Sequence, residues 1–155
     1  MSSPRRIYLL FVVVACAGSA CGPEPNDLWG SIDQSHDLSF DTVELRLLTG
    51  QSVYQLTYMK DLEASETDDV VAKVVFDRPQ DGIPLDEKIP FDGDSIVERV
   101  TAANDPLPAL REGSVTFHEG GSEDQQHTVG EFAATFENGK TLNGNFDTSL
   151  RLVDF

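Results

Sequence analysis

Two histidines, His118 and His127, are the residues of this chain whose type and spacing come nearest to a metal site. They flank the loop 119–126, and each lies at the end of a segment that alternates like a β-strand. If those strands pair, the two imidazoles approach each other, and Glu119 or Asp124 supplies a third ligand of a kind that Zn²⁺ accepts. The simpler alternative is two exposed histidines on an acidic loop, and we therefore predict no metal ion and no other cofactor.

Signatures of catalysis are missing from the sequence. It has no Gly-x-Ser-x-Gly, no phosphate-binding loop and no His-Glu-x-x-His, and its histidines are His36, His118 and His127. Acidic turns such as Asp92-Gly93-Asp94 hold oxygen ligands that suit Ca²⁺, but their spacing does not match an EF-hand. We predict that the protein is not an enzyme.

The start of the chain has the pattern of an export signal. Arg5 and Arg6 form a short basic region, residues 7–17 carry no charge, and Gly18-Ser19-Ala20 follows. An apolar segment of this length is too short to cross a bilayer as a helix, which takes about 20 residues. A basic start, a short apolar core and small residues before a boundary are typical of a cleaved export signal.

Residues 1–21 resemble the signal of bacterial lipoproteins, in which a diacylglyceryl group is attached to the cysteine that becomes the mature N-terminus. The resemblance implies lipidation at Cys21. Cys16 is the alternative, because Val13-Val14-Ala15 fits the usual motif better than Gly18-Ser19-Ala20 does. Cleavage before Cys21 leaves the longer apolar core and places a proline-containing spacer directly after the lipid. An ordinary cleaved signal with a secreted product is a further alternative.

These features predict three parts: a signal peptide over 1–20, a lipidated cysteine with its tether over 21–30, and an acidic β-domain over 31–155. The lipid makes the membrane a partner, in the cell envelope. Gly22 is not the Asp that holds enteric lipoproteins at the inner membrane, so by analogy we expect the outer membrane. Secretion and the inner membrane are the alternatives.

The net charge of the chain limits the classes of partner that it can bind. Arg5 and Arg6 lie before Cys21, so 9 of the 11 basic residues and all 27 acidic residues belong to 21–155, a net charge of −18. A nucleic-acid partner would require a basic footprint, and we expect none. Anionic lipid head groups would also be repelled, so attachment must come from the acyl chains. A protein partner in the envelope is compatible with this charge.

From residue 41 onward, alternation of apolar and polar residues dominates the sequence, except for an irregular stretch over 78–94 that contains three prolines and two glycines. Such alternation indicates strands with one buried face. We predict an all-β fold: a single antiparallel β-sandwich or small β-barrel of about seven to eight strands, with the last strand pairing near the start of the chain and closing the sheet. The predicted strands are 43–47, 54–58, 70–76, 96–100, 115–117, 128–136 and 141–153.

The register of the last two strands follows from their apolar faces. A two-residue Asn138-Gly139 turn would be the usual choice, but it would place the two apolar sets on opposite faces. A three-residue loop over 137–139 instead pairs Ala134 with Leu142 and gives Gly139 the left-handed position. This register also pairs Phe132 with Gly144, so we expect aromatic rings to lie over bare backbone.

For function we predict a non-catalytic, membrane-anchored binding or structural module. The alternative is a carrier of a small apolar ligand that resembles lipocalin-like barrels. For Trp29, the one tryptophan, we predict a plug at one end of the core, with a ligand-stacking ring at a pocket mouth as the alternative. In a carrier the pocket walls would be Trp29, Phe132, Phe136, Leu142, Phe146 and Leu150.

Overall fold

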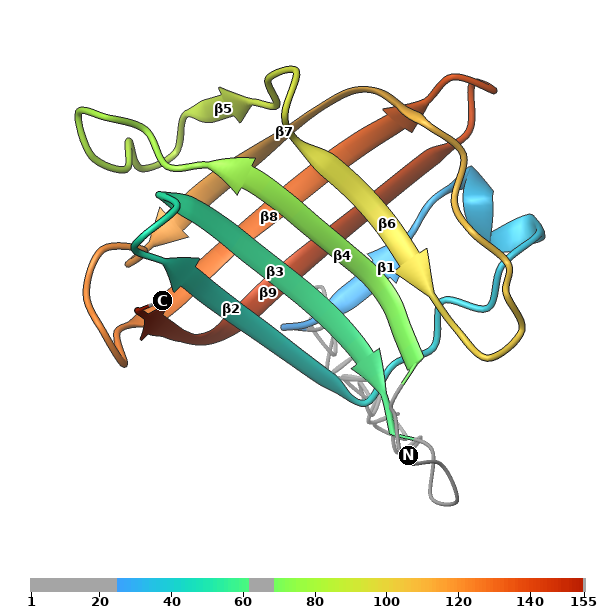
Figure 1. Ribbon diagram of the computed structural model, residues 1–155, viewed down its shortest axis with the longest axis horizontal. Helices are drawn as coiled ribbons and strands as arrows, with labels where there is room; N and C mark the ends of the chain where they lie inside the picture. The colour runs from blue at the N-terminus through green and yellow to red at the C-terminus, as the bar shows by residue number, and fades with distance from the viewer. Residues whose placement is uncertain (1–24, 62–68, 155) are drawn as a thin grey trace, which may run out of the picture.

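Strands of one sheet make up most of the described chain (Figure 1). The computed structural model describes residues 25–61 and 69–154, and within these ranges it contains no α-helix. A 3₁₀ helix, η1, covers Ser31–Gln34. The strands are β1 (Asp27–Trp29), β2 (Thr42–Leu48), β3 (Val53–Lys60), β4 (Asp69–Asp77), β5 (Lys88–Pro90), β6 (Ile96–Val100), β7 (Leu110–Glu119), β8 (His127–Phe136) and β9 (Thr141–Val153).

The nine strands form one open sheet in the order β5-β7-β8-β9-β2-β3-β4-β6, and β1 adds to β9. All pairs are antiparallel except β2 with β9. The first part of β9 pairs with β8 and β1, and its last residues pair with β2. In Figure 1, β2, β3, β4 and β6 lie in front of β7, β8 and β9. We call these four strands the front half, and β1, β9, β8, β7 and β5 the back half.

The all-β prediction is confirmed, and each of the seven predicted strands is present. The predicted closure of the sheet is wrong, because its edges β5 and β6 do not pair with each other. β5 has three residues and ends in Pro90, which lacks an N–H and suits an edge. Neither the sandwich nor the barrel is therefore confirmed. The last strand does pair near the start of the chain, with β1 and β2.

The core lies between the two halves of the sheet. Tyr54 of β3 has its ring centroid 5.5 Å from that of Phe117 of β7, and Tyr58 of β3 lies 6.0 Å from Phe132 of β8. Both tyrosine hydroxyls donate to carbonyls on the opposite side of the core, Tyr54 to Gly121 in the β7–β8 loop and Tyr58 to Asn145 of β9. Burial raises the pKa of Tyr58 well above its ordinary value, with a smaller contribution from Asp27. Aromatic contacts and hydrogen bonds thus join the halves.

The predicted register of the last hairpin is confirmed. Ala134 pairs with Leu142, and Phe132 pairs with Gly144. Phe136 N–H donates to the Lys140 carbonyl at 2.9 Å, which encloses the three-residue loop, and Gly139 has a φ of 79°. Burial of both apolar faces has therefore fixed the register.

Aromatic rings do lie over glycines. A Cβ at Gly130 would be 2.4 Å from Cζ of Phe146, and a Cβ at Gly144 would be 2.5 Å from Cε1 of Phe132. The two rings occupy the space that side chains would otherwise take. On the inner surface of the back half, aromatic rings of β8 and β9 thus pack directly on the glycine backbone of the neighbouring strand.

The predicted boundary between tether and domain, at residue 30, lies after the first strand of the sheet. Residues up to 30 were expected to be tether, but Asp27, Leu28 and Trp29 form β1 and pair with Asn145, Gly144 and Asn143. The side chain of Leu28 enters the core, whereas its neighbours are exposed. Trp29 is 43% exposed, so the predicted core plug is wrong. Alternation along this short strand directs the indole outward.

The residues of the predicted signal peptide and the two candidate lipidation sites, Cys16 and Cys21, lie outside the described residues. In the part of the chain that is described, no helix has the length and apolar character needed to cross a membrane.

Candidate ligand-binding site

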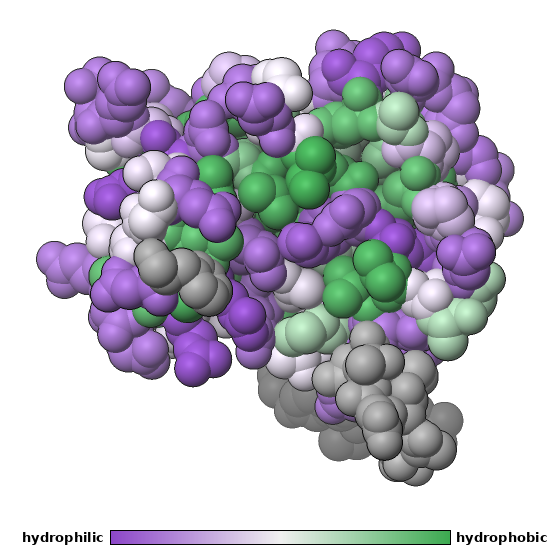
Figure 2. All heavy atoms as spheres, in the orientation of Figure 1, coloured by the Kyte–Doolittle hydropathy of each residue, from purple (hydrophilic) through white to green (hydrophobic). Residues whose placement is uncertain are grey.

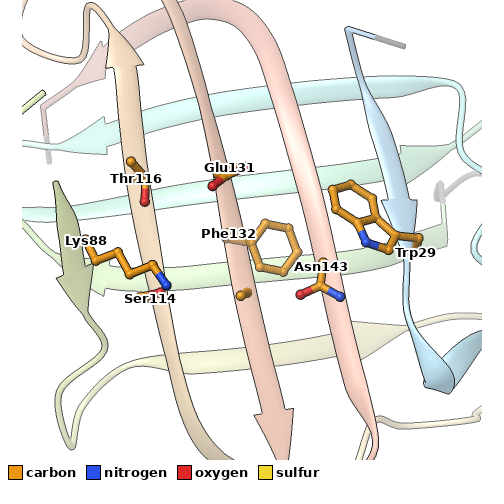
Figure 3. A pocket seen from close by; sticks show the side chains of 8 residues that line it. Trp29, Lys88, Ser114, Thr116, Glu131, Phe132 and Asn143 are labelled. Carbon is orange, nitrogen blue, oxygen red and sulfur yellow. The ribbon is translucent and has the colours of Figure 1, made fainter. Parts of the chain in front are cut away.

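A hollow of about 270 Å³ lies on the outer face of the back half. Figure 3 displays its lining side chains on the strands of that half. We call it the outer groove. It is lined by Trp29, Lys88, Ser114, Thr116, Glu131, Phe132, Ala133 and Asn143.

Strand pairing explains why residues so far apart in sequence meet here. Ser114, Ala133, Asn143 and Trp29 are successive partners across β7, β8, β9 and β1. In the adjacent row, Lys88 of β5 is the partner of Thr116, which in turn pairs with Glu131. Side chains two residues apart on a strand share a face, so the two rows form one surface.

The shape of the groove results from residue size along these rows. Ala133 and Ser114 are small, whereas Trp29 stands on one side of them and Lys88 on the other. In Figure 3 the indole extends from β1 toward β9, and the Lys88 side chain extends from β5 toward β7. Phe132 also borders the groove, but it is 2% exposed and its ring contacts Tyr58 in the core.

The groove offers an aromatic ring and several polar groups. Asn143 can donate and accept hydrogen bonds, as can the hydroxyls of Ser114 and Thr116. Glu131 accepts and Lys88 donates. Within the described residues, Lys88 and Glu131 form no ion pair with each other. The groove thus combines one exposed aromatic ring with several polar side chains, and it is more polar than the predominantly apolar pockets that usually bind drug-sized molecules.

A charged cluster lies on the same outer face, toward the far end of β8. His127 Nε2 lies 2.6 Å from Asp147 Oδ1, and His127 Nδ1 lies 3.4 Å from Glu119 Oε1. The hydrogen bond with Asp147, followed by that with Glu119, raises the pKa of His127 above its ordinary value. When this imidazole is protonated, it forms surface ion pairs with both carboxylates.

The metal candidates do not form one site. His118 Nδ1 contacts Asp86 Oδ1 at 2.7 Å, His127 is held as described above, and Asp124 accepts the backbone N–H of Leu152. The carboxylates beside His127 bind opposite nitrogens of the ring, so they cannot share one ion with it. Among the described residues, no group of three or more His, Cys, Asp or Glu side chains could hold a metal ion.

His36 contacts a hydroxyl, as a catalytic histidine would. Its Nδ1 lies 2.9 Å from Ser35 Oγ, and its Nε2 lies 3.4 Å from the carbonyl of Pro106. Ser35 Oγ also donates to the Ile32 carbonyl and accepts from Lys140 Nζ. The serine hydroxyl therefore closes the last turn of η1 and links it to the β8–β9 loop.

The side chains proposed as walls of an apolar cavity lie in the core. Phe146 packs edge-on against Phe117, with a centroid distance of 5.7 Å. Tyr58 packs against Phe132 from the opposite half. All five are at most 2% exposed: Phe132, Phe136, Leu142, Phe146 and Leu150. The Trp29 side chain lies on the outer face, where Phe132 is the one member of this set that also borders the groove.

Sequence reasoning missed most of the outer groove. It named Trp29 as a stacking ring at a pocket mouth only as an alternative, and it named Phe132 as a wall of an inner pocket. The outward residues of β5, β7, β8 and β9 carried no signal, because each is an ordinary solvent-facing position in an alternating strand. Two small residues, Ser114 and Ala133, in paired strands would have been the available clue, once the pairing was known.

Comparison with protein-family models, with curated proteins and with solved structures finds no match for this chain.

Proposed function

We propose that this chain is a non-catalytic lipoprotein of the bacterial cell envelope, anchored through Cys21, whose β-domain binds a ligand in the outer groove. The anchor rests on the basic start, the short uncharged segment 7–17 and the small residues before Cys21. The binding role rests on one observation: an exposed Trp29 beside a polar hollow.

The position of β1 would keep the domain close to its anchor. Residues 22–26 lie between Cys21 and the start of β1. Five residues reach at most roughly 17 Å when fully extended. Trp29 is in β1, so an acylated Cys21 would hold the outer groove near the membrane surface. The proposed location is the outer membrane, on the analogy drawn from Gly22.

A non-catalytic role fits the surroundings of the histidines. Each ring nitrogen of His127 lies against a carboxylate, and His36 contacts a hydroxyl that is already bound to a carbonyl and an ammonium group. A general base needs a free nitrogen within hydrogen-bond reach of the proton that it removes. The groove itself contains no histidine.

The anchor is tested by a matched pair of cysteine variants. Cys21→Ser should remove the acyl mass and release the protein from the membrane fraction, whereas Cys16→Ser should keep both. Intact mass of the purified protein and its partition between membrane and soluble fractions are the measurements. Loss of acylation in Cys16→Ser instead would move the anchor to Cys16, and an unmodified wild type would exclude a lipoprotein.

The binding role is tested through the fluorescence of Trp29, the one tryptophan of the chain. The full chain is dissolved in a detergent without a sugar head group, and acrylamide quenching is measured with and without a protein-free envelope extract. A ligand in the groove should shield the indole and lower the quenching constant. Unchanged quenching at all extract concentrations would contradict a binding role for this groove.

A further inference from the structure

The outer groove is wide for a single pocket and is bounded on two sides. From β1 to β5 the back half has five strands, and neighbouring strands lie about 4.8 Å apart, so the surface between Trp29 and Lys88 is roughly 19 Å across. The hollow itself, at about 270 Å³, is just below the usual 300–1,000 Å³ of pockets for drug-sized ligands. One ring-sized group fits the hollow, and a longer molecule can continue across the strands toward β5.

Trp29 supplies a flat apolar surface at one side of this groove. Its indole is 43% exposed although the chain has a core that could bury it. Aromatic faces carry partial negative charge and attract weakly positive C–H groups. One face of a pyranose ring is made of such C–H groups, whereas a flexible alkyl chain has no matching plane. An exposed indole beside a ring-sized hollow therefore suits a sugar ring.

The polar residues complement the rim of a sugar. Each sugar hydroxyl both donates and accepts a hydrogen bond, so it requires a surface that offers both. Asn143, the direct partner of Trp29 across β1 and β9, presents an amide with two donors and an acceptor. Beyond it, Ser114 offers a hydroxyl, whereas Thr116 borders the groove but is only 7% exposed.

Charge argues for a neutral ligand. The net charge of the chain is −16, which repels anions at long range. A cation would be attracted by this field, but Lys88 at the edge of the groove would oppose it locally. Lys88 and Glu131 both border the groove with opposite charges, separated by Thr116 across the strands. The two charges sum to zero, and each side chain can form a hydrogen bond with a ligand hydroxyl.

From these four features we infer that the outer groove binds a neutral oligosaccharide, with one pyranose ring stacked on Trp29 and its hydroxyls bound by Asn143 and Ser114. This inference rests on the proposed binding function and names its ligand class. The ammonium of Lys88 and the carboxylate of Glu131 bind the sugars that follow along the groove.

The test uses the full chain in the same sugar-free detergent. Three neutral tetrasaccharides, maltotetraose, cellotetraose and chitotetraose, are titrated against Trp29 fluorescence, alongside the anionic tetragalacturonate and the cation tetramethylammonium. At least one neutral tetrasaccharide should change the emission saturably, and neither charged probe should. The affinity is then measured by calorimetry, which also serves variants without the reporter.

Variants link the affinity to the groove. Trp29→Ala should weaken binding by about 10-fold to 100-fold, the range that stacking on an aromatic side chain commonly provides. Trp29→Phe should keep part of it, and Asn143→Ala should weaken it by about 10-fold. Ile96→Ala is the matched control, since Ile96 has the same 43% exposure but lies on the front half. Circular dichroism establishes that each variant is folded.

Each outcome separates the inference from the function on which it rests. Saturable binding of a neutral tetrasaccharide that is lost in Trp29→Ala and kept in Ile96→Ala supports the inference. Shielding of Trp29 by the envelope extract, with no response to any neutral tetrasaccharide or with a response to a charged probe alone, overturns the sugar assignment and leaves the binding function standing. Failure of both extract and sugars overturns both.

Discussion

The outer faces of the two halves of the sheet differ in how their polar groups are used. On the front half, Lys73 and Glu98 form an ion pair at 2.7 Å, and Ile96 and Val100 lie on either side of Glu98 along β6. Figure 2 shows this face as apolar areas separated by a hydrophilic band. Lys88 and Glu131 of the back half have no such pairing with each other and border a hollow instead.

This difference shows which features distinguish a candidate binding site from an ordinary exposed surface. Single exposed apolar side chains are normal on a soluble protein, and Ile96 is as exposed as Trp29. What the back half adds is small residues that leave space and polar groups that remain available to a ligand. On the front half, Lys73 and Glu98 already pair with each other between β4 and β6.

The largest expected effect concerns the packing that supports the back half from inside. A Cβ at Gly130 would lie 2.5 Å from the Thr116 carbonyl oxygen, which belongs to the backbone and cannot rotate away. Gly130→Ala should therefore destabilise the fold by about 1–3 kcal/mol through overpacking. Urea unfolding followed by circular dichroism measures this change.

Gly93→Ala provides the control for that substitution. A Cβ at Gly93 would meet no atom within 4 Å. Its effect on the free energy of unfolding should stay within about 0.5 kcal/mol, as for most surface changes. Equal effects of the two substitutions would show that contact with bare backbone does not hold the back half together.

A smaller effect should appear on changing the pH. The folded protein holds the proton of His127 more tightly than the unfolded chain does, because Asp147 and Glu119 raise the pKa of that imidazole. The cluster therefore stabilises the fold fully below the unfolded pKa of about 6.5 and loses this contribution as the pH rises through the raised value. The midpoint of thermal unfolding between about pH 6 and 8.5 should decline accordingly.

Asp147→Asn should flatten that decline, since it removes the larger of the two contributions to the raised pKa. Glu137→Gln, an exposed carboxyl in the β8–β9 loop, is the matched change of one charge and should leave the slope unaltered. If both variants behave like the wild type, the pH dependence has another origin.

Sequence patterns predicted the positions of single strands and the pairing of one strand with its direct hairpin partner. Alternation located seven strands, and the apolar faces fixed the register of β8 and β9 correctly. β1 and β5 were missed because three residues are too few to display a period. The parallel contact of β2 with β9 and the open edges depend on strands far apart in sequence, about which alternation says nothing.

The outer groove was harder to predict for the same reason. Its residues come from five strands, and each residue alone resembles a solvent-facing position. Trp29 was expected to close the core, because a lone tryptophan is a large apolar side chain. Its outward direction follows from Leu28, which takes the inward position of β1 opposite Gly144. That choice could not be read before the pairing of β1 with β9 was known.

The smallest expected effect on the free energy of unfolding concerns the exposed apolar residues of the front half. Ile96→Thr and Val100→Thr keep a β-branched side chain on β6 and should each change the free energy of unfolding by no more than about 0.5 kcal/mol. Neither should alter sugar binding, because both side chains lie on the face opposite the groove. Urea unfolding and calorimetry measure the two quantities.

A loss above about 1 kcal/mol, together with a change in sedimentation, would mean that these residues are buried between copies of the chain. The front half would then be an interface, and its exposed apolar residues would have a function of their own.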